Sequence, residues 1–128
     1  MDGYNVAVVG ATGAVGEAMM EILEERKFPV NNVFPLASER SAGSRLQFNG
    51  KSLVVQDLST FDFSQAQIGL FSAGGSVSEY YAPKAAAAGC VVIDNTSHFR
   101  RDDDIPLVVP EVNAVRVKDY SDRNIIAN

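Results

Sequence analysis

Gly10-Ala11-Thr12-Gly13-Ala14-Val15-Gly16 is the stretch from which the fold of this chain is predicted. It follows an apolar run at residues 5–9, typical of a buried parallel strand, and it precedes a helical pattern. A glycine-rich turn between a strand and a helix is the context of a dinucleotide-binding site. In such a site Gly10 permits the tight turn, Gly13 lets backbone approach a pyrophosphate, and Gly16 lets the helix pack closely on the sheet.

The helix after this turn is expected from about Thr12 to Arg26. Its N-terminus would present free N–H groups and a partial positive charge to phosphates. The glycine spacing is G-x-x-G-x-x-G rather than G-x-G-x-x-G, so a turn with a purely structural role is the alternative. Apolar residues of this helix form one stripe at helical spacing: Val15, Ala18, Met19, Ile22 and Leu23.

Apolar β-rich runs alternate with helical patterns along the rest of the chain. This alternation predicts a doubly wound, Rossmann-like α/β fold with a mostly parallel sheet, in one NAD(P)-binding domain over residues 1–128. Asn49-Gly50 predicts a hairpin, and a second helix is expected from near Ser76 to Gly89. Further strands are expected at residues 32–37, 68–71, 91–94, 107–109 and 124–127.

Composition excludes several classes of protein. The 128 residues carry a formal net charge of −5, with 46% hydrophobic and 21% charged residues. That balance is typical of a globular protein, and an acidic chain lacks the basic surface that binds nucleic acid. No apolar run is long enough to span a membrane, and no secretory signal is expected, because residues 1–5 have no basic segment before an apolar one. The single cysteine, Cys90, fits a reducing compartment, so a cytoplasmic protein is expected.

Cofactor choice is predicted from the end of the second strand. Residues 28–38 contain no carboxylate for the ribose 2′-hydroxyl of NAD. Ser38, at the end of this range, and Arg40 and Ser41, just beyond it, supply two hydroxyls and a guanidinium, which suit the 2′-phosphate of NADP(H). Glu39 lies among these residues and complicates this interpretation, in which its side chain would point to solvent. The alternative is that Glu39 and Arg40 belong to an ordinary solvated loop.

Three further stretches narrow the class: FSAGGS at residues 71–76, DNTSHFR at 94–100 and PLVVPEVN at 106–113. Together with residues 10–16 and 37–43, they resemble bacterial aspartate-semialdehyde dehydrogenase over essentially the whole chain. The resemblance implies an NADPH-dependent enzyme that reductively dephosphorylates L-aspartyl 4-phosphate to L-aspartate 4-semialdehyde. That step leads to lysine, threonine and methionine. The resemblance also implies a homo-oligomer, either a dimer or a tetramer.

The resemblance assigns roles to individual residues. Arg100 would bind the phosphate of the substrate, or free phosphate, with Arg101 as the alternative. Arginine suits this role because it makes charge-assisted hydrogen bonds to the departing anion. The cofactor would be held at the pyrophosphate by Thr12, Gly13, Ala14 and Val15, at the 2′-phosphate by Ser38, Arg40 and Ser41, and along its border by Ser72, Ala73 and Gly74.

The chain also departs from the family's pattern. The family's nucleophile is a cysteine in a Pro-Asn-Cys stretch directly after a strand like residues 124–128, and this chain ends at Asn128. No catalytic residue is therefore expected here. The C-terminal catalytic and dimerisation domain is expected to be absent, and the chain is expected to bind NADP weakly without turnover. Cys90 is expected to be a buried structural residue. His98, the one histidine, has no partner cluster for a metal site.

Three alternatives remain. One is a non-catalytic nucleotide-binding paralogue or module, native at this length. Another is N-acetylglutamyl-phosphate reductase, which shares the chemistry and the fold. The third is a short-chain dehydrogenase relative, because Tyr80 and Lys84 form a Y-x-x-x-K pair. That pair comes early in the chain, and Pro83 is expected in the first turn of a helix rather than within one.

Overall fold

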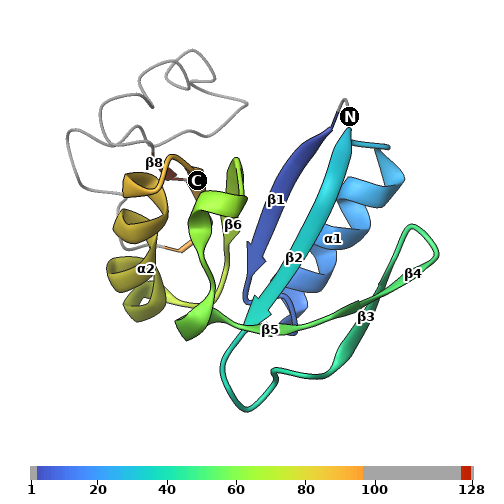
Figure 1. Ribbon diagram of the computed structural model, residues 1–128, viewed down its shortest axis with the longest axis horizontal. Helices are drawn as coiled ribbons and strands as arrows, with labels where there is room; N and C mark the ends of the chain where they lie inside the picture. Colours follow the sequence, from blue (N-terminus) through green and yellow to red (C-terminus); the bar gives the residue numbers. More distant parts are fainter. Residues whose placement is uncertain (1–2, 97–124, 128) are drawn as a thin grey trace.

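A six-stranded parallel sheet with helices on both faces forms the described part of the chain, residues 3–96 and 125–127 of a computed structural model (Figure 1). Its strands lie in the order β5-β2-β1-β6-β7-β8. The bounds are β1 Tyr4–Val9, β2 Val30–Ala37, β5 Gln56–Asp57, β6 Ile68–Phe71, β7 Val91–Asp94 and β8 Ile125–Ala127. The chain winds outward from β1 to β5 and then returns to β6 beside β1. This is the order of a doubly wound dinucleotide-binding sheet, as predicted.

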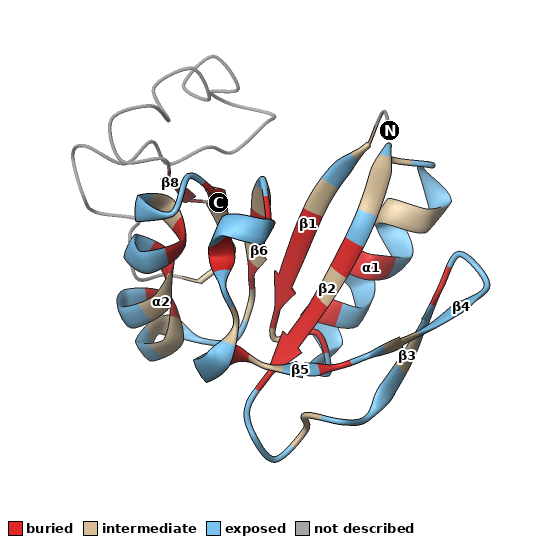
Figure 2. Ribbon diagram, viewed as in Figure 1, coloured by how far each residue is buried: buried red, intermediate tan, exposed pale blue. Residues whose placement is uncertain are grey.

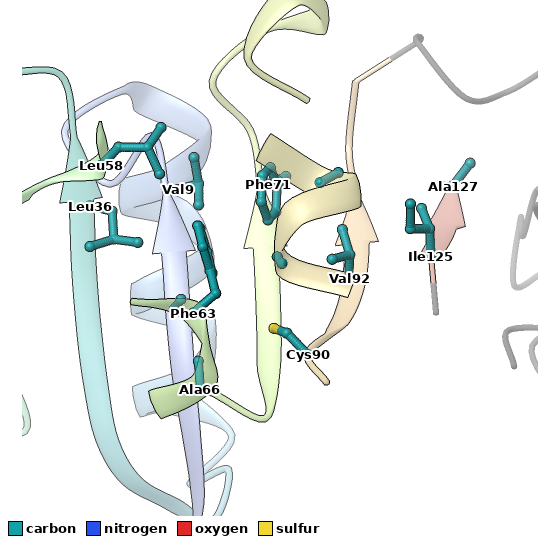
Figure 3. Packing of buried hydrophobic residues seen from close by; sticks show 13 residues of the cluster. Val9, Leu36, Leu58, Phe63, Ala66, Phe71, Cys90, Val92, Ile125 and Ala127 are labelled. Carbon is teal, nitrogen blue, oxygen red and sulfur yellow. The ribbon is translucent and has the colours of Figure 1, made fainter. Parts of the chain in front are cut away.

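In the described part of the chain, two helices cover the sheet, α1 (Ala14–Glu25) and α2 (Gly75–Ala87). Side chains of a strand point alternately to opposite faces, so β1 contributes to two cores. Val6 and Val8 pack in the cluster that contains Met20 of α1. Ala7 and Val9 pack in the cluster on the α2 side (Figure 3). Figure 2 shows the resulting burial along β1 and β2, with the outer helix faces exposed.

The buried face of α1 differs from the predicted stripe. Gly16 and Met20 are buried and Leu23 is partly buried, a spacing of i, i+4 and i+7. Gly16 directs this face toward the sheet because the lack of a side chain allows the closest approach there. Met19 of the predicted stripe is also partly buried, whereas three of its members are exposed: Val15 (45%), Ala18 and Ile22 (50%).

The predicted hairpin is present. Strands β3 (Arg45–Phe48) and β4 (Lys51–Val54) pair antiparallel. Asn49 and Gly50 between them have φ of 49° and 77°, the positive values that a two-residue type I′ turn requires. Phe48 packs in the same cluster as Met20, so the hairpin covers part of the α1 side of the sheet.

Helix α2 contains a proline that was expected in its first turn. Pro83 lies well inside the helix, so its position does not argue against the Tyr80 and Lys84 pair. Lys84 Nζ lies 5.0 Å from the centroid of the Tyr80 ring, and Tyr80 is 61% exposed. The pair therefore forms a cation–π contact at the helix surface. The helix ends before Gly89, whose φ of 97° suits glycine, as predicted.

Three short elements between the hairpin and β6 were not predicted. They are β5 and two 3₁₀ turns, η1 (Leu58–Thr60) and η2 (Phe63–Gln65). Asp57 and Asp62 cap the two turns by accepting from the N–H groups of Ser59 and Ser64. The repeated Asp-x-Ser pattern was the local signal for these turns. The strand expected at residues 107–109 lies outside the described residues. Within them, no helix is both long and apolar enough to cross a membrane.

Candidate functional site

The strands on either side of the topological switch, β1 and β6, end in turns that lie against each other. A Cβ atom on Gly10 would lie 3.1 Å from Cα and Cβ of Ala73. The Ser72 N–H donates to the carbonyl oxygen of Val9 at 3.0 Å, and the Ser72 hydroxyl is 3.2 Å from the same oxygen. Sheets of this kind bind ligands in the crevice at such a switch, beyond the carboxyl ends of the strands.

The turn at residues 10–16 requires glycine at two positions for internal reasons. Gly10 has a φ of +88°, and its N–H donates to the carbonyl oxygen of Leu36 at 2.9 Å. A Cβ atom on Gly16 would lie 2.1 Å from the carbonyl oxygen of Gly10. A Cβ atom on Gly13 would meet that oxygen at 3.5 Å, an ordinary contact. Packing therefore explains Gly10 and Gly16, whereas the glycine at position 13 has no internal explanation.

Both helices begin at this edge of the sheet without a capping side chain. The N-cap residue is Gly13 for α1 and Gly74 for α2, and neither helix has a side-chain hydrogen bond at its cap. The first N–H groups of a helix have no partner within the helix and carry partial positive charge. Two helix N-termini on either side of the switch are thus available to an anion such as a pyrophosphate.

A cleft of about 470 Å³ lies beside these turns. Among the predicted cofactor residues, those that line it are Gly10, Thr12, Ser38 and Ala73. The other predicted cofactor residues do not line it: Gly13, Ala14, Val15, Gly16, Arg40, Ser41, Ser72 and Gly74. The cleft therefore unites the turn after β1, the end of β2 and the turn after β6.

The residues just beyond β2 form a turn. The N–H groups of Ser41 and Ala42 both donate to the carbonyl oxygen of Ser38, at 2.9 and 3.0 Å. Successive residues of such a turn point in different directions, about 100° apart in a helical turn. Glu39 lines the cleft and Arg40 does not. Both residues are exposed, so the predicted assignment of Arg40 to the 2′-phosphate, with Glu39 pointing to solvent, stays a prediction.

Several cleft residues were missed by sequence analysis. Val77 and Tyr81 of α2 form an apolar wall together with Leu58. Their i, i+4 spacing on α2 was a usable signal for a shared face. Asp57, the last residue of β5, and Ser59, two positions after it, line the same cleft. The Ser59 hydroxyl (2.7 Å) and then its N–H (2.9 Å) donate to Asp57 and hold the pKa of this carboxyl below its usual value.

Cys90 lies away from the cleft and is fully buried. Burial raises the pKa of its thiol to about 12. A buried, protonated thiol is a poor nucleophile, so Cys90 fills space in the core, as predicted. The remaining predicted positions, Arg100 with its alternative Arg101 and the histidine at 98, lie outside the described residues.

Known proteins are similar to this chain in sequence and in structure. The sequence profile of the family described as "Semialdehyde dehydrogenase, NAD binding domain" matches residues 5–120. An aspartate-semialdehyde dehydrogenase of Shewanella sp. (strain DB6705) is 62% identical over 125 residues, which cover 98% of this chain and 37% of that protein. The chain thus spans 37% of the length of this curated relative.

Solved structures extend the similarity to three dimensions. The structure of aspartate semialdehyde dehydrogenase II from Vibrio cholerae, complexed with ASA, is 62% identical with a TM-score of 0.96. The match covers 98% of this chain and 41% of that one. An aspartate semialdehyde dehydrogenase from Candida albicans, solved with NADP, is 25% identical with a TM-score of 0.78, covering 98% of this chain and 42% of that one.

Proposed function

Because this chain belongs to the family of semialdehyde dehydrogenase NAD-binding domains, we propose that it is the NADP(H)-binding part of an aspartate-semialdehyde dehydrogenase. The proposed reaction is the reductive dephosphorylation of L-aspartyl 4-phosphate to L-aspartate 4-semialdehyde. One observation carries the proposal: the cleft at the topological switch lies beside the turns that lead into two helix N-termini, and neither N-terminus has a capping side chain. The relatives that are 62% identical to this chain are enzymes of that name.

The pyrophosphate of the cofactor fits the glycine turn at residues 10–16. Gly13 is the position where a side chain would meet no internal obstacle, so its absence leaves room for an external group. The first-turn N–H groups of α1 lie directly after it and can donate to phosphate oxygens. We therefore assign Gly13, with Thr12 and the N–H groups of Ala14 and Val15, to the pyrophosphate.

The adenosine end of NADP(H) fits the part of the cleft beyond β2. Its wall of Leu58, Val77 and Tyr81 offers apolar surface to a purine ring. In the described part of the chain, the Arg40 side chain makes no hydrogen bond or ion pair. Because Arg40 is exposed and unpaired there, it can turn toward a 2′-phosphate at little cost, together with the hydroxyls of Ser38 and Ser41.

The chemistry divides between the cofactor and the protein. When bound, NADPH supplies the hydride that reduces the acyl group. The chain binds the cofactor, and the turn after β6, with Ser72, Ala73 and Gly74, borders it. Arg100, which lies outside the described residues, is proposed to bind the phosphate of the substrate, with Arg101 as its alternative. Cys90 takes no part in the proposed reaction, because its thiol is buried and protonated.

The proposal also includes a homo-oligomer, either a dimer or a tetramer, and a cytoplasmic location. A dinucleotide titration tests its central claim. We expect each chain to bind one NADPH and the binding to saturate. The change in nicotinamide fluorescence measures this binding. The adenosine analogue 2′,5′-ADP should compete, because it carries the adenosine and the 2′-phosphate. A chain that binds neither NADPH nor NADH would contradict the proposed function.

A further inference from the structure

We infer that Glu39 limits the preference of this site for NADP and allows NAD(H) as a second cofactor. The inference rests on the proposed function, because it concerns the same cleft. The carboxylate of Glu39 would accept a hydrogen bond from the ribose 2′-hydroxyl of NAD. The same carboxylate would repel the 2′-phosphate of NADP.

The position of Glu39 in the fold supports this role. Glu39 follows the last residue of β2 by two positions and follows Gly16 by 23. In doubly wound dinucleotide sites, an acidic residue about 20 residues beyond the glycines hydrogen-bonds the ribose 2′-hydroxyl. The carboxylate expected of an NAD site is thus present just beyond residue 38.

The lining of the cleft supports this role as well. Glu39 lines the cleft beside Ser38, whereas Arg40, the next residue in the turn, does not. The Glu39 carboxylate makes no hydrogen bond or ion pair within residues 3–96 and 125–127. Its acceptor capacity is therefore available to a ligand, and its charge is not neutralised by a described neighbour.

The negative charge of the cleft also favours a 2′-hydroxyl over a 2′-phosphate. Its lining contains a second carboxylate, Asp57, whose pKa is lowered by the hydroxyl and the N–H of Ser59, so it is ionised at neutral pH. None of the described residues that line the cleft is a lysine or an arginine. A 2′-phosphate would bring further negative charge to this end, whereas a 2′-hydroxyl brings none. Like charges at short range repel, and a cleft wall reduces the screening by water.

Replacement of Glu39 by glutamine tests the inference, because it removes the charge and keeps the size. We expect Glu39→Gln to bind NADPH about threefold more tightly and NADH about threefold more weakly, the size typical of exposed charge interactions. The ratio of the two dissociation constants should therefore move about tenfold toward NADPH. Glu39→Gln should likewise bind 2′,5′-ADP more tightly and 5′-AMP more weakly, because these two fragments differ only at the 2′ position of the ribose.

The matched control is Glu25→Gln, which changes the net charge equally at an exposed position at the end of α1. The ratio of the NADPH and NADH dissociation constants in Glu25→Gln should equal that of the wild type. The gain for NADPH in Glu39→Gln should shrink as salt rises, because screening acts within about 10 Å at 0.1 M salt.

The outcomes separate the two proposals. A wild-type chain that binds NADPH but has no measurable affinity for NADH would overturn the inference and leave the proposed function intact. An unchanged ratio in Glu39→Gln, or weaker binding of NADPH, would do the same. A wild-type chain that binds neither dinucleotide would overturn both.

Discussion

The hydroxyl of Ser78 donates a 2.8 Å hydrogen bond to Oδ1 of Asp94, and both residues are completely buried. Thr96 adds two bonds to the same carboxylate, from its N–H to Oδ1 at 3.0 Å and from its hydroxyl to Oδ2 at 2.9 Å. A buried carboxylate is tolerated when its oxygens accept such bonds. The network ties the first turns of α2 to the end of β7, so it fixes the helix that borders the cleft.

Removal of the Ser78 hydroxyl should destabilise the fold. Ser78→Ala leaves Asp94 buried with one donor fewer, and hydrogen bonds to charged groups contribute about 1.5–3 kcal/mol. We expect the free energy of unfolding in urea to fall by that amount. Ser76→Ala, at an exposed position on the same helix, should change it by less than about 0.5 kcal/mol. Equal effects of the two substitutions would show that the buried bond contributes nothing.

Alanine at position 16 should disrupt the glycine turn. Its Cβ would lie 2.1 Å from the carbonyl oxygen of Gly10 and 2.8 Å from Cα of Ala11, so backbone must move. Overpacking of this kind costs about 1–3 kcal/mol. We expect Gly16→Ala to lower the urea midpoint and to weaken NADPH binding as well. Wild-type stability in this variant would contradict the tight packing of α1 on the turn.

Alanine at position 13 should separate binding from stability. Its Cβ would be 3.5 Å from the carbonyl oxygen of Gly10, which a folded chain tolerates. The φ of Gly13 is −84°, which alanine adopts without strain. We expect Gly13→Ala to unfold at nearly the wild-type urea concentration and to bind NADPH more weakly, because the methyl group would occupy the space of the pyrophosphate. Unchanged NADPH affinity would exclude Gly13 from the site.

Arg40 should discriminate between the two cofactors. Loss of a charge-assisted contact to the 2′-phosphate should cost about 1.5–3 kcal/mol of NADPH binding in Arg40→Ala. The same variant should bind NADH almost as the wild type does. Calorimetric titration measures both affinities, and Lys51→Ala, an exposed cation on the hairpin, serves as the control for net charge. Equal losses for NADPH and NADH would refute the assignment of Arg40.

Cys90 should make stability depend on pH in the alkaline range. Burial raises the pKa of the folded thiol to about 12, above the ordinary value of 9.0. The unfolded thiol therefore loses its proton first, so the stabilising contribution is complete below pH 9 and is lost as the pH rises toward 12. Relative to Cys90→Ala, the wild type should lose about 1.4 kcal/mol per pH unit above pH 9. Parallel pH profiles of the two proteins would show that the thiol titrates normally.

Much of the fold follows from local patterns. The bounds of β6 and β7 are those predicted, and β1 and β2 differ from prediction only by residues at their N-terminal ends. Asn49-Gly50 forms the predicted hairpin because both residues adopt positive φ. Buried parallel strands are apolar on both faces, so short runs of sequence suffice to identify them. The glycine turn was also recognisable from a short stretch, because the backbone conformations that require glycine there are local.

Other features were beyond local patterns. The predicted stripe of α1 overlaps the buried face only at Met19 and Leu23, because the contact of Gly16 with Gly10 decides which side meets the sheet. The edge strand β5 has only two residues, and its pairing with Leu36 and Ala37 defines it. The proline in the middle of α2 contradicts its usual preference for a first turn.

Sequence patterns thus account for the strands, the turns and the dinucleotide-binding character of this chain, because those depend on backbone preferences within a few residues. The lining of the cleft was decided by tertiary structure. Glu39 rather than Arg40 lines the cleft, and Asp57, Val77 and Tyr81 join it from elements far apart in the sequence. The bond between Ser78 and Asp94 likewise joins residues 16 positions apart. Such contacts depend on how helices and strands pack, which no short stretch of sequence encodes.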